Sequence, residues 1–333
     1  MSKGVISISV TAPARLHLGF LDLNGSRGRR YGSVGLALDA PCVELSIRHA
    51  PAFASAGPQA QRAAEIARKF CERYALTREF QLNISQAIPE HAGLGSGTQL
   101  GLAVGVACAR MHGLALTIRE IAAVAERGQR SGIGAGAFES GGFLVDGGKG
   151  EGDDPPPVIS RLEFPEEWRI LLVFERAARG LHGDRENAAF RELPPFPAAL
   201  SGHLCRLMVM QALPALAERN IERFGEAIGE LQRVTGDHFQ SAQGGRFASP
   251  QVAEVLAWLE SQGIAGIGQS SWGPTGFAII ASEDQAEFLA DKARARWGEA
   301  GRLQFETCRG RNRGGSIEAT QTMVAPLKAG RAS

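Results

Sequence analysis

The stretch PEHAGLGSGTQ, residues 89–99, has the residue types that bind phosphate and stands where a helix begins. Its alternating glycines let backbone N–H groups converge, and the N-terminus of the helix predicted after it carries about half a positive charge. The pattern is neither GxxxxGK[ST] nor GxGxxG, so it predicts neither a P-loop nor a dinucleotide fold. The alternative is an ordinary glycine turn with a serine cap. We expect an anion site formed by Gly93, Gly95, Ser96, Gly97 and Thr98.

Charged residues near the N-terminus could act on such an anion. Arg15 and His17 alternate along a predicted strand, so they face the same side of it. Arginine is seldom buried without a partner, so Arg15 is predicted to be a site residue, whereas His17 fits a site and a hydrogen-bonded core position equally well. The loop that follows offers Asp22, Arg29 and Arg30. The two arginines could clamp an anion, or they could be solvated.

A further charged group lies in RGLHGDRENAAF, residues 179–190. His182, Asp184 and Arg185 stand among glycines, as in a loop that builds a site with perturbed pKa values. The alternative is a helix start in which Asp184 is the N-cap and Arg185 the first helical residue.

Periodicity predicts the elements that position these residues in the first half of the chain. Alternation of polar and apolar residues predicts strands at 5–13, 43–50 and 80–85, with a loop at 21–34. A helix is predicted at 61–76, a second at 118–127 behind the capping box of Thr117 and Glu120, and a strand at 141–148. Three consecutive prolines at 155–157 exclude regular structure and predict a boundary between domains 1–158 and 159–333.

The second half alternates strands and helices in a different order. We expect a strand at 168–174, helices within 197–240, strands near 264–270 and at 276–280, and a last strand at 303–307. Ser249 with Pro250, and Ser282 with Gln285, predict the starts of two helices between these strands. This β-α-β-β-α-β order is that of a ferredoxin-like sandwich, so the predicted class is α+β with two domains.

Composition excludes several classes of function. Lys and Arg total 36 and Asp and Glu 35 among 333 residues, so no net field attracts nucleic acid or a membrane surface. The chain has no uninterrupted apolar run of 18 residues, which predicts no membrane span. Five scattered cysteines without a CxxC pair predict neither a disulfide framework nor a zinc site, and they suit the cytoplasm.

The motifs resemble those of a known superfamily. PxxxGLGS before a helix resembles the central phosphate loop of the GHMP superfamily of small-molecule kinases, and 11–20, 130–138 and 269–279 stand where its other motifs stand. The resemblance implies a ribosomal-protein-like α+β N-terminal domain and a ferredoxin-like C-terminal domain. Sugar and mevalonate kinases have an aspartate where this chain has Gly134, which cannot accept a proton.

Longer strings at 12–41, 88–105, 127–148 and 266–279 resemble one branch of that superfamily, the β-ribofuranosylaminobenzene 5′-phosphate synthases. The resemblance implies condensation of 5-phosphoribosyl 1-diphosphate with 4-aminobenzoate, with loss of CO₂ and diphosphate, in tetrahydromethanopterin biosynthesis; some relatives take 4-hydroxybenzoate. No base is needed when CO₂ leaves in place of a ring proton, which agrees with Gly134. The alternatives are an ATP-dependent kinase of a small alcohol, and a ligand-binding homologue without catalysis.

These considerations give the predicted site. Catalytic roles are expected of Arg15, His17, Asp184 and Arg185. The phosphate loop is expected to be joined by Arg130, Ser270, Ser271 and Gly273, and substrate contacts are expected from Asp22, Arg29, Arg30, His182 and Trp272, although Trp272 also fits structural packing. Mg²⁺ is expected on the diphosphate, held by Ser96 and by Glu126 or Glu139, with no organic cofactor. Family resemblance implies a homodimer.

Overall fold

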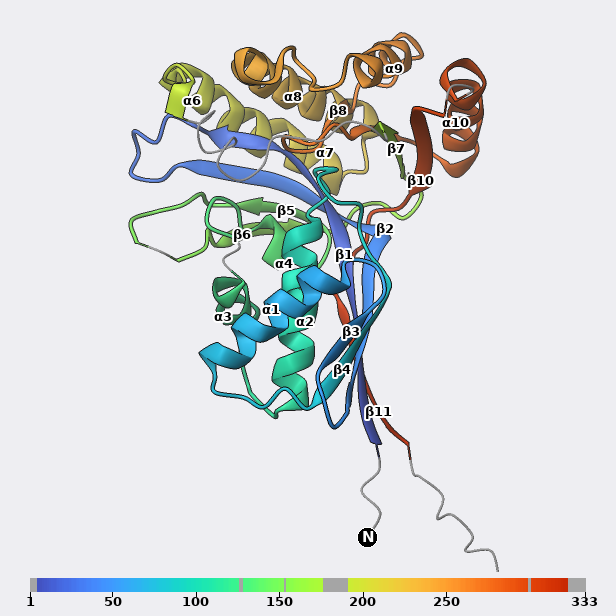
Figure 1. Ribbon diagram of the computed structural model, residues 1–333. Coiled ribbons are helices and arrows are strands. Elements are labelled where there is room, and N and C mark those ends of the chain that lie inside the picture. The colour runs from blue at the N-terminus through green and yellow to red at the C-terminus, as the bar shows by residue number, and fades with distance from the viewer. Residues whose placement is uncertain (1–4, 126–127, 153, 176–190, 299–300, 323–333) are drawn as a thin grey trace, which may run out of the picture.

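The computed structural model describes residues 5–125, 128–152, 154–175, 191–298 and 301–322. The protein has two α+β layers (Figure 1). The lower layer is a seven-stranded sheet with its helices, and the upper layer is a four-stranded sheet with its helices. The predicted two-domain α+β fold is confirmed. Among the described residues, no helix is long and apolar enough to cross a membrane.

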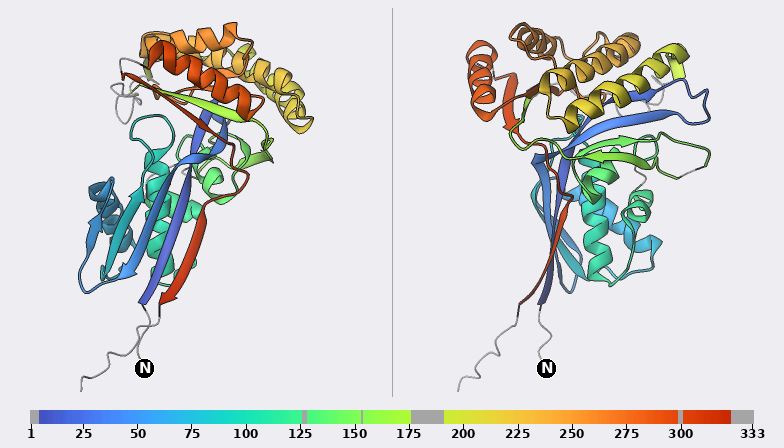
Figure 2. Two further views of the ribbon diagram at one scale, coloured as in Figure 1. Left: turned by 90° about the vertical axis from the view of Figure 1, so that its right-hand side faces the viewer. Right: turned by 180° about the vertical axis from the view of Figure 1, so that it is seen from behind.

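The lower layer is built on a mainly antiparallel sheet. Its strands are β1 (Val5–Asp22), β2 (Tyr31–His49), β3 (Ala54–Ala56), β4 (Phe80–Gln86), β5 (Phe143–Asp146), β6 (Val158–Leu162) and β11 (Ser316–Thr322). They run in the order β11-β1-β2-β4-β3, and β5 pairs with both β2 and β6. One face is covered by α1 (Ala60–Arg73), α2 (Ser96–Met111), α3 (Ile118–Val124) and α4 (Ile133–Glu139) (Figure 2). The predicted capping box of Thr117 and Glu120 starts α3.

The hairpin of β1 and β2 connects the two layers. The loop predicted over 21–34 is shorter than expected, because the strands stay paired as far as Asp22 and Tyr31. Leu16, Leu18 and Phe20 are buried along this extension, which packs under helix α8 (Ile221–Gln243) of the upper layer. The residues of the first motif, 11–20, therefore lie on one continuous strand that reaches both layers.

The upper layer has the predicted ferredoxin-like order. Its strands are β7 (Arg169–Glu175), β8 (Ile267–Gln269), β9 (Gly276–Ile280) and β10 (Leu303–Cys308), antiparallel in the order β10-β7-β9-β8. Its helices are α6 (Ala198–Leu207), η1 (Met208–Ala212), α7 (Leu213–Ala217), α8 (Ile221–Gln243), α9 (Pro250–Ser261) and α10 (Glu283–Trp297). The predicted caps are confirmed, since the Ser249 and Ser282 hydroxyls accept hydrogen bonds from Val252 N (3.0 Å) and Gln285 N (3.3 Å).

The domain boundary differs from the prediction at residues 158 and 159. Strand β6 follows the prolines but pairs with β5 in the lower sheet, so the boundary falls after it. Strand β11 also returns to that sheet and pairs along β1 from Val5 to Thr11. The open edge of a long strand such as β1 needs a partner or a cover. Segment 316–322 is mostly polar, so its sequence gives little indication that it pairs with β1.

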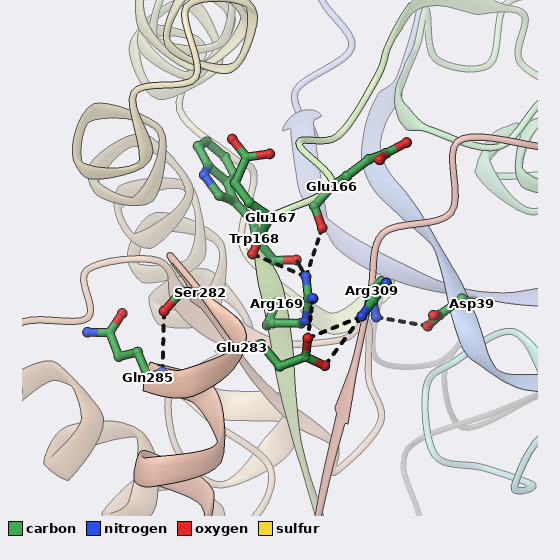
Figure 3. Close-up of polar contacts among 9 residues, drawn as sticks. All are labelled: Asp39, Glu166, Glu167, Trp168, Arg169, Ser282, Glu283, Gln285 and Arg309. Atoms are coloured by element: carbon green, nitrogen blue, oxygen red, sulfur yellow. Dashed lines mark hydrogen bonds and ion pairs between the residues drawn. The ribbon is translucent and has the colours of Figure 1, made fainter.

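An ionic cluster joins the returning chain to both layers (Figure 3). Arg169 is buried and donates to the Glu166, Glu167 and Trp168 carbonyls and, at 2.8 Å, to Glu283. Arg309 donates to the same Glu283 carboxylate, and its backbone N–H donates to Asp39 of β2 (2.8 Å). Hydrogen bonds from Arg169 and Arg309 lower the pKa of Glu283. The cluster therefore helps to fix the angle between the two layers.

Candidate active site

The predicted phosphate loop lies at the start of the buried helix α2. Gly93 and Gly95 both have φ of 83°, a left-handed conformation that glycine adopts without strain. Gly95 is the N-cap of α2 and has no side chain that could cap the first turn. The N–H groups of that turn, including those of Ser96 and Gly97, are therefore available to an anion, together with the positive end of the helix dipole.

Arg15 lies against this loop, and its catalytic role stays a prediction. Its Nη1 donates to the Gly93 carbonyl oxygen (2.6 Å), and its backbone N–H donates to Leu94 O (3.1 Å). A methyl group placed on Gly95 would come within 3.3 Å of Arg15 Nε. The guanidinium therefore adds a full positive charge beside the helix N-terminus.

The loop at 270–273 packs directly on the phosphate loop. The Ser270 hydroxyl donates to Gly93 O (2.8 Å) and accepts from His17 N (3.1 Å), and Ser271 N donates to His17 O (3.1 Å). An added Cβ on Gly93 would lie 2.2 Å from Ser270 O, and one on Gly273 would lie 2.3 Å from Ala92 O. We call this meeting of residues 15–17, 92–96 and 270–273 the glycine junction. Phosphate binding by Ser270, Ser271 and Gly273 stays a prediction; in the structure these residues hold the junction together.

His17 is buried in the glycine junction. Burial and the nearby charge of Arg15 lower the pKa of its imidazole to about 3, and the charge of Arg130 acts in the same direction. The ring is therefore neutral near pH 7, and it packs against Phe20 with centroids 4.6 Å apart. His17 can exchange hydrogen bonds there but cannot act as a cation. Phosphate binding by Arg130 stays a prediction.

Packing, as well as chemistry, explains why position 134 is a glycine. A Cβ at this position would lie 2.8 Å from the Thr98 methyl carbon of α2. The Gly134 carbonyl accepts a hydrogen bond from the buried Gln99 side chain (2.8 Å). Helix α4 thus meets the first turn of α2 at van der Waals distance, with no room for an aspartate unless Thr98 moves.

Sequence reasoning missed Asp146, a buried carboxylate that orders the loop before α4. It accepts hydrogen bonds from the backbone N–H groups of Ser33 (2.8 Å), Gly132 (2.8 Å) and Gly148 (2.9 Å). Burial raises its pKa, and these hydrogen bonds oppose the rise. The acidic residue before the last two glycines of GGFLVDGG was the available signal, because strand-end carboxylates beside glycines commonly bind backbone N–H groups.

Two buried glutamines, also missed, support the glycine junction from the upper layer. Gln232 of α8 donates to Leu18 O (2.6 Å) and accepts from Gln269 N (2.8 Å). Gln269 in turn donates to Ser271 O (2.9 Å) and accepts from Ala248 N (2.6 Å). Their signal was weak, since glutamine side chains are mostly exposed in folded proteins.

The residues predicted in the hairpin loop separate in the structure. Asp22 Oδ1 accepts from Asn24 N, Gly25 N and the Ser201 hydroxyl, each at 2.9 Å, so it holds the turn. Arg29 donates to the carbonyls of Gly147 (2.6 Å) and Gly148 (2.7 Å). Arg30 donates to Leu23 O (3.2 Å). The two arginine side chains therefore bind different carbonyls, and substrate binding by Arg29 and Arg30 stays a prediction.

Arg30 lines a hollow beside the hairpin. We call it the hairpin hollow; its volume is about 310 Å³, and it is lined by Leu23, Arg30, Tyr31, Arg191, Leu193, Pro194, Pro195, Phe196 and His238. Aromatic contacts connect it to the glycine junction, since Phe239 touches His238 and Trp272 at 5.2 and 4.5 Å between centroids. Trp272 is buried in this cluster, which fits the packing alternative considered for it.

The remaining predicted residues are not assembled by the described structure. Glu126, His182, Asp184 and Arg185 lie outside the described residues. Glu139 ends α4, where its backbone lies against Gly314, a full turn beyond the contact of Gly134 with Thr98. Among the described residues no three His, Cys, Asp or Glu side chains gather to hold a metal ion. Binding of Mg²⁺ by Ser96 with Glu126 stays a prediction, because residue 126 lies outside the described residues.

Comparisons with known proteins agree with this architecture. Residues 61–142 match the GHMP kinases N terminal domain and 212–299 match GHMP kinases C terminal. The chain is 35% identical to β-ribofuranosylphenol 5′-phosphate synthase of Methanothermobacter thermautotrophicus, over 83% of this chain and 89% of that one. It is 33% identical to the protein of that name from Archaeoglobus fulgidus, over 93% and 99%.

Solved structures share the fold at lower identity. The L. major mevalonate kinase complex with R-mevalonate superposes with a TM-score of 0.68 at 17% identity, covering 93% of this chain and 99% of that one. A complex of MDDEF with MVAPP, AMPPCP and magnesium gives 0.64 at 17%, covering 96% and 100%.

The fold and the glycine junction define a member of the GHMP superfamily. Within that superfamily, the chain belongs to the family of the β-ribofuranosylphenol 5′-phosphate synthases.

Proposed function

We propose that this chain is a decarboxylating phosphoribosyltransferase, which condenses 5-phosphoribosyl 1-diphosphate with 4-aminobenzoate and releases CO₂ and diphosphate. The observation that carries the proposal is 31–35% identity to three synthases over 81–93% of the chain. The product would enter tetrahydromethanopterin biosynthesis.

The bond changes suit the groups in the glycine junction. The bond between the ribosyl anomeric carbon and diphosphate breaks, and its electron pair leaves with the diphosphate. The ring carbon that bears the carboxylate attacks the anomeric carbon, and the carboxylate then leaves as CO₂, returning its bonding electrons to the ring. No proton has to be removed from the ring, which agrees with Gly134.

Negative charge develops on the departing diphosphate, so the site must stabilise it. The uncapped first turn of α2 and the Arg15 guanidinium supply fixed positive charge at one place. Such preorganised donors are often the largest contribution to catalysis. Arg130, which lies near His17, adds to the same field. Mg²⁺ would arrive on the diphosphate and keep most of its ligands as substrate oxygens and water.

The para substituent of the acceptor distinguishes two versions of the reaction. The relatives are named for a phenol product, whereas the sequence resemblance implied an aminobenzene product. Both substituents push electrons toward the carboxylate-bearing carbon. The assay therefore offers 4-aminobenzoate and 4-hydroxybenzoate separately with the donor and Mg²⁺, and detects the ribosylated arene by mass spectrometry. Absence of a coupled product with both acceptors would overturn the proposal.

One observation favours the kinase alternative. A cavity of about 140 Å³ lies beside Gly97 between α1, α2 and α3, with Ile66, Phe70 and Ile121 among its walls. Its walls also include the charged residues Arg62, Glu65 and Lys69. A cavity with apolar walls and a few polar groups next to a phosphate loop is what an adenine ring would need. Gly134 counts against phosphoryl transfer to an alcohol because the activating carboxylate is missing. The same assay with ATP and candidate alcohols, read as ADP formation, separates the two functions.

We also propose a cytoplasmic homodimer. The five cysteines are free, as expected in a reducing compartment, and family resemblance implies the dimer. Sedimentation of the full chain would give one species of twice the chain mass, and a monomer at all concentrations would contradict the dimer.

A further inference from the structure

The hairpin hollow has the chemistry of an aromatic carboxylate site. Its walls combine apolar and aromatic side chains with polar ones, and Phe196 is buried with its ring edge-on to His238, at 4.9 Å between centroids. Two arginines, Arg30 and Arg191, line the same space. Its volume of about 310 Å³ reaches the lower end of the range for small-ligand sites. A phosphate alone would leave the aromatic wall unused, whereas a benzoate uses both the wall and the cations.

The backbone at the hollow is held in an unusual conformation. Tyr31 has φ of 80°, which is costly for a bulky residue and is maintained only when the surrounding structure requires it. Arg30 is fixed by its Nε hydrogen bond to Leu23 O and by backbone pairing with Lys149. These constraints fix the backbone of Arg30 and Tyr31, which both line the hollow, before any ligand binds.

Two routes of contact connect the hollow to the glycine junction. On one side, Tyr31 touches Phe20, whose ring packs on His17. On the other, His238 touches Phe239, which packs on Trp272. On each route a single ring, that of Phe20 or Phe239, lies between the hollow and the glycine junction.

We propose that the hairpin hollow binds the benzoate acceptor, with Arg30 and Arg191 at its carboxylate and Phe196 and His238 against its ring. This inference rests on the proposed function and adds the acceptor site to it. It makes Arg191 and Phe196, which sequence reasoning did not single out, determinants of acceptor binding. Burial lowers the pKa of His238, so its imidazole is mostly neutral near pH 7 and is able to exchange a hydrogen bond with a para substituent.

The test compares the full chain with Arg191→Gln and Phe196→Leu. Arg206→Gln on α6 and Phe288→Leu on α10 are matched controls, because both residues are exposed and neither lines the hollow. Arg191→Gln is expected to raise KM for the benzoate about tenfold or more, since a hydrogen bond between charged groups is lost. KM for the phosphoribosyl donor should change less than twofold, and the controls should match the unmodified chain. Phe196→Leu should raise the benzoate KM several-fold in the same way.

Two results would overturn the inference while the proposed function stands: an unchanged benzoate KM in both variants, or a donor KM that rises instead. If the unmodified chain forms no product, the proposed function fails, and calorimetry with 4-aminobenzoate decides the inference separately. Binding that Arg191→Gln abolishes and Arg206→Gln keeps would support the acceptor site. Equal binding by both variants, or no binding by the unmodified chain, would overturn it.

Discussion

The glycine junction and the hairpin hollow are neighbouring regions built in opposite ways. The junction is made of main chain, with Gly93 and Gly273 so close to carbonyl oxygens that a Cβ would lie 2.2 and 2.3 Å from them. The hollow is made of side chains, including Arg30, Arg191 and Phe196. A backbone-built site fixes geometry and tolerates little change, whereas a site lined by side chains can vary its ligand at low cost to folding. The difference suggests that the junction serves the donor and the chemistry, and that the hollow sets acceptor specificity.

The largest effect is expected for Gly93→Ala, at the closest backbone contact in the glycine junction. Gly93→Ala combines the 2.2 Å contact with φ of 83°, so it should lower the free energy of unfolding by about 3 kcal/mol or more and abolish activity. Gly244 is the matched control, because it has φ of 83° and an added Cβ there would meet no atom of the described residues within 4 Å. Gly244→Ala should cost only about 1 kcal/mol. Denaturant unfolding measures both, and equal losses would refute the close-packed junction.

The next largest effect is expected for Arg15→Ala, and it should reduce catalysis more than stability. Arg15→Ala removes the cation beside Gly93 and should lower kcat/KM for the donor about 100-fold. Arg48→Ala, at an exposed position of the same sheet, serves as the control and should leave kcat/KM unchanged. Steady-state kinetics at varied donor concentration give the comparison. An Arg15→Ala enzyme as active as the control would remove Arg15 from the site.

His17 should make stability fall in acid. Its pKa is lowered from 6.5 to about 3 in the folded protein, so between these values the unfolded chain binds a proton that the folded chain does not. This residue therefore contributes stability above pH 6.5 that is lost as pH falls, by about 1.4 kcal/mol for each pH unit down to about pH 3. Urea unfolding at pH 6.5, 5.5 and 4.5 should show a shallower decline for His17→Gln. His49→Gln, exposed at the end of β2, should keep the full decline; identical slopes for all three proteins would contradict a buried neutral His17.

The smallest effect concerns Gly134 and Thr98. Gly134→Ala should gain helix propensity but lose more by the 2.8 Å contact with the Thr98 methyl, giving a net destabilisation of about 1 kcal/mol. In a Thr98→Ser background that methyl is absent, so Gly134→Ala should become neutral or stabilising. A double-mutant cycle from thermal unfolding measures this coupling. Additive effects would mean that the two helices do not pack through this pair.

The sequence predicted the local features of the fold better than its long-range pairings. The capping box at Thr117, the caps at Ser249 and Ser282 and the ferredoxin-like strand order follow from short-range chemistry and periodicity, and all are present. The return of β11 to β1 was not predicted, since pairing between residues 316 and 11 depends on the whole fold.

The candidate site shows the same division. The glycine loop and Arg15 were identifiable because their residue types and spacing carry the chemistry. The supporting groups Asp146, Gln232 and Gln269 were not, because what marks them is burial together with hydrogen bonds to distant backbone. The hairpin hollow unites residues 23–31 with 191–196 and 238, a grouping that no local pattern contains.

The most direct test of the account follows the carboxylate carbon. The full chain is incubated with carboxyl-labelled 4-aminobenzoate, Mg²⁺ and 5-phosphoribosyl 1-diphosphate, with 4-hydroxybenzoate and ATP as parallel arms, and released CO₂ is counted. The account predicts label release that requires the ribosyl donor and is lost in Arg15→Ala. No donor-dependent release from either benzoate, with ADP formed from an alcohol and ATP, would contradict it and assign the glycine junction to a kinase.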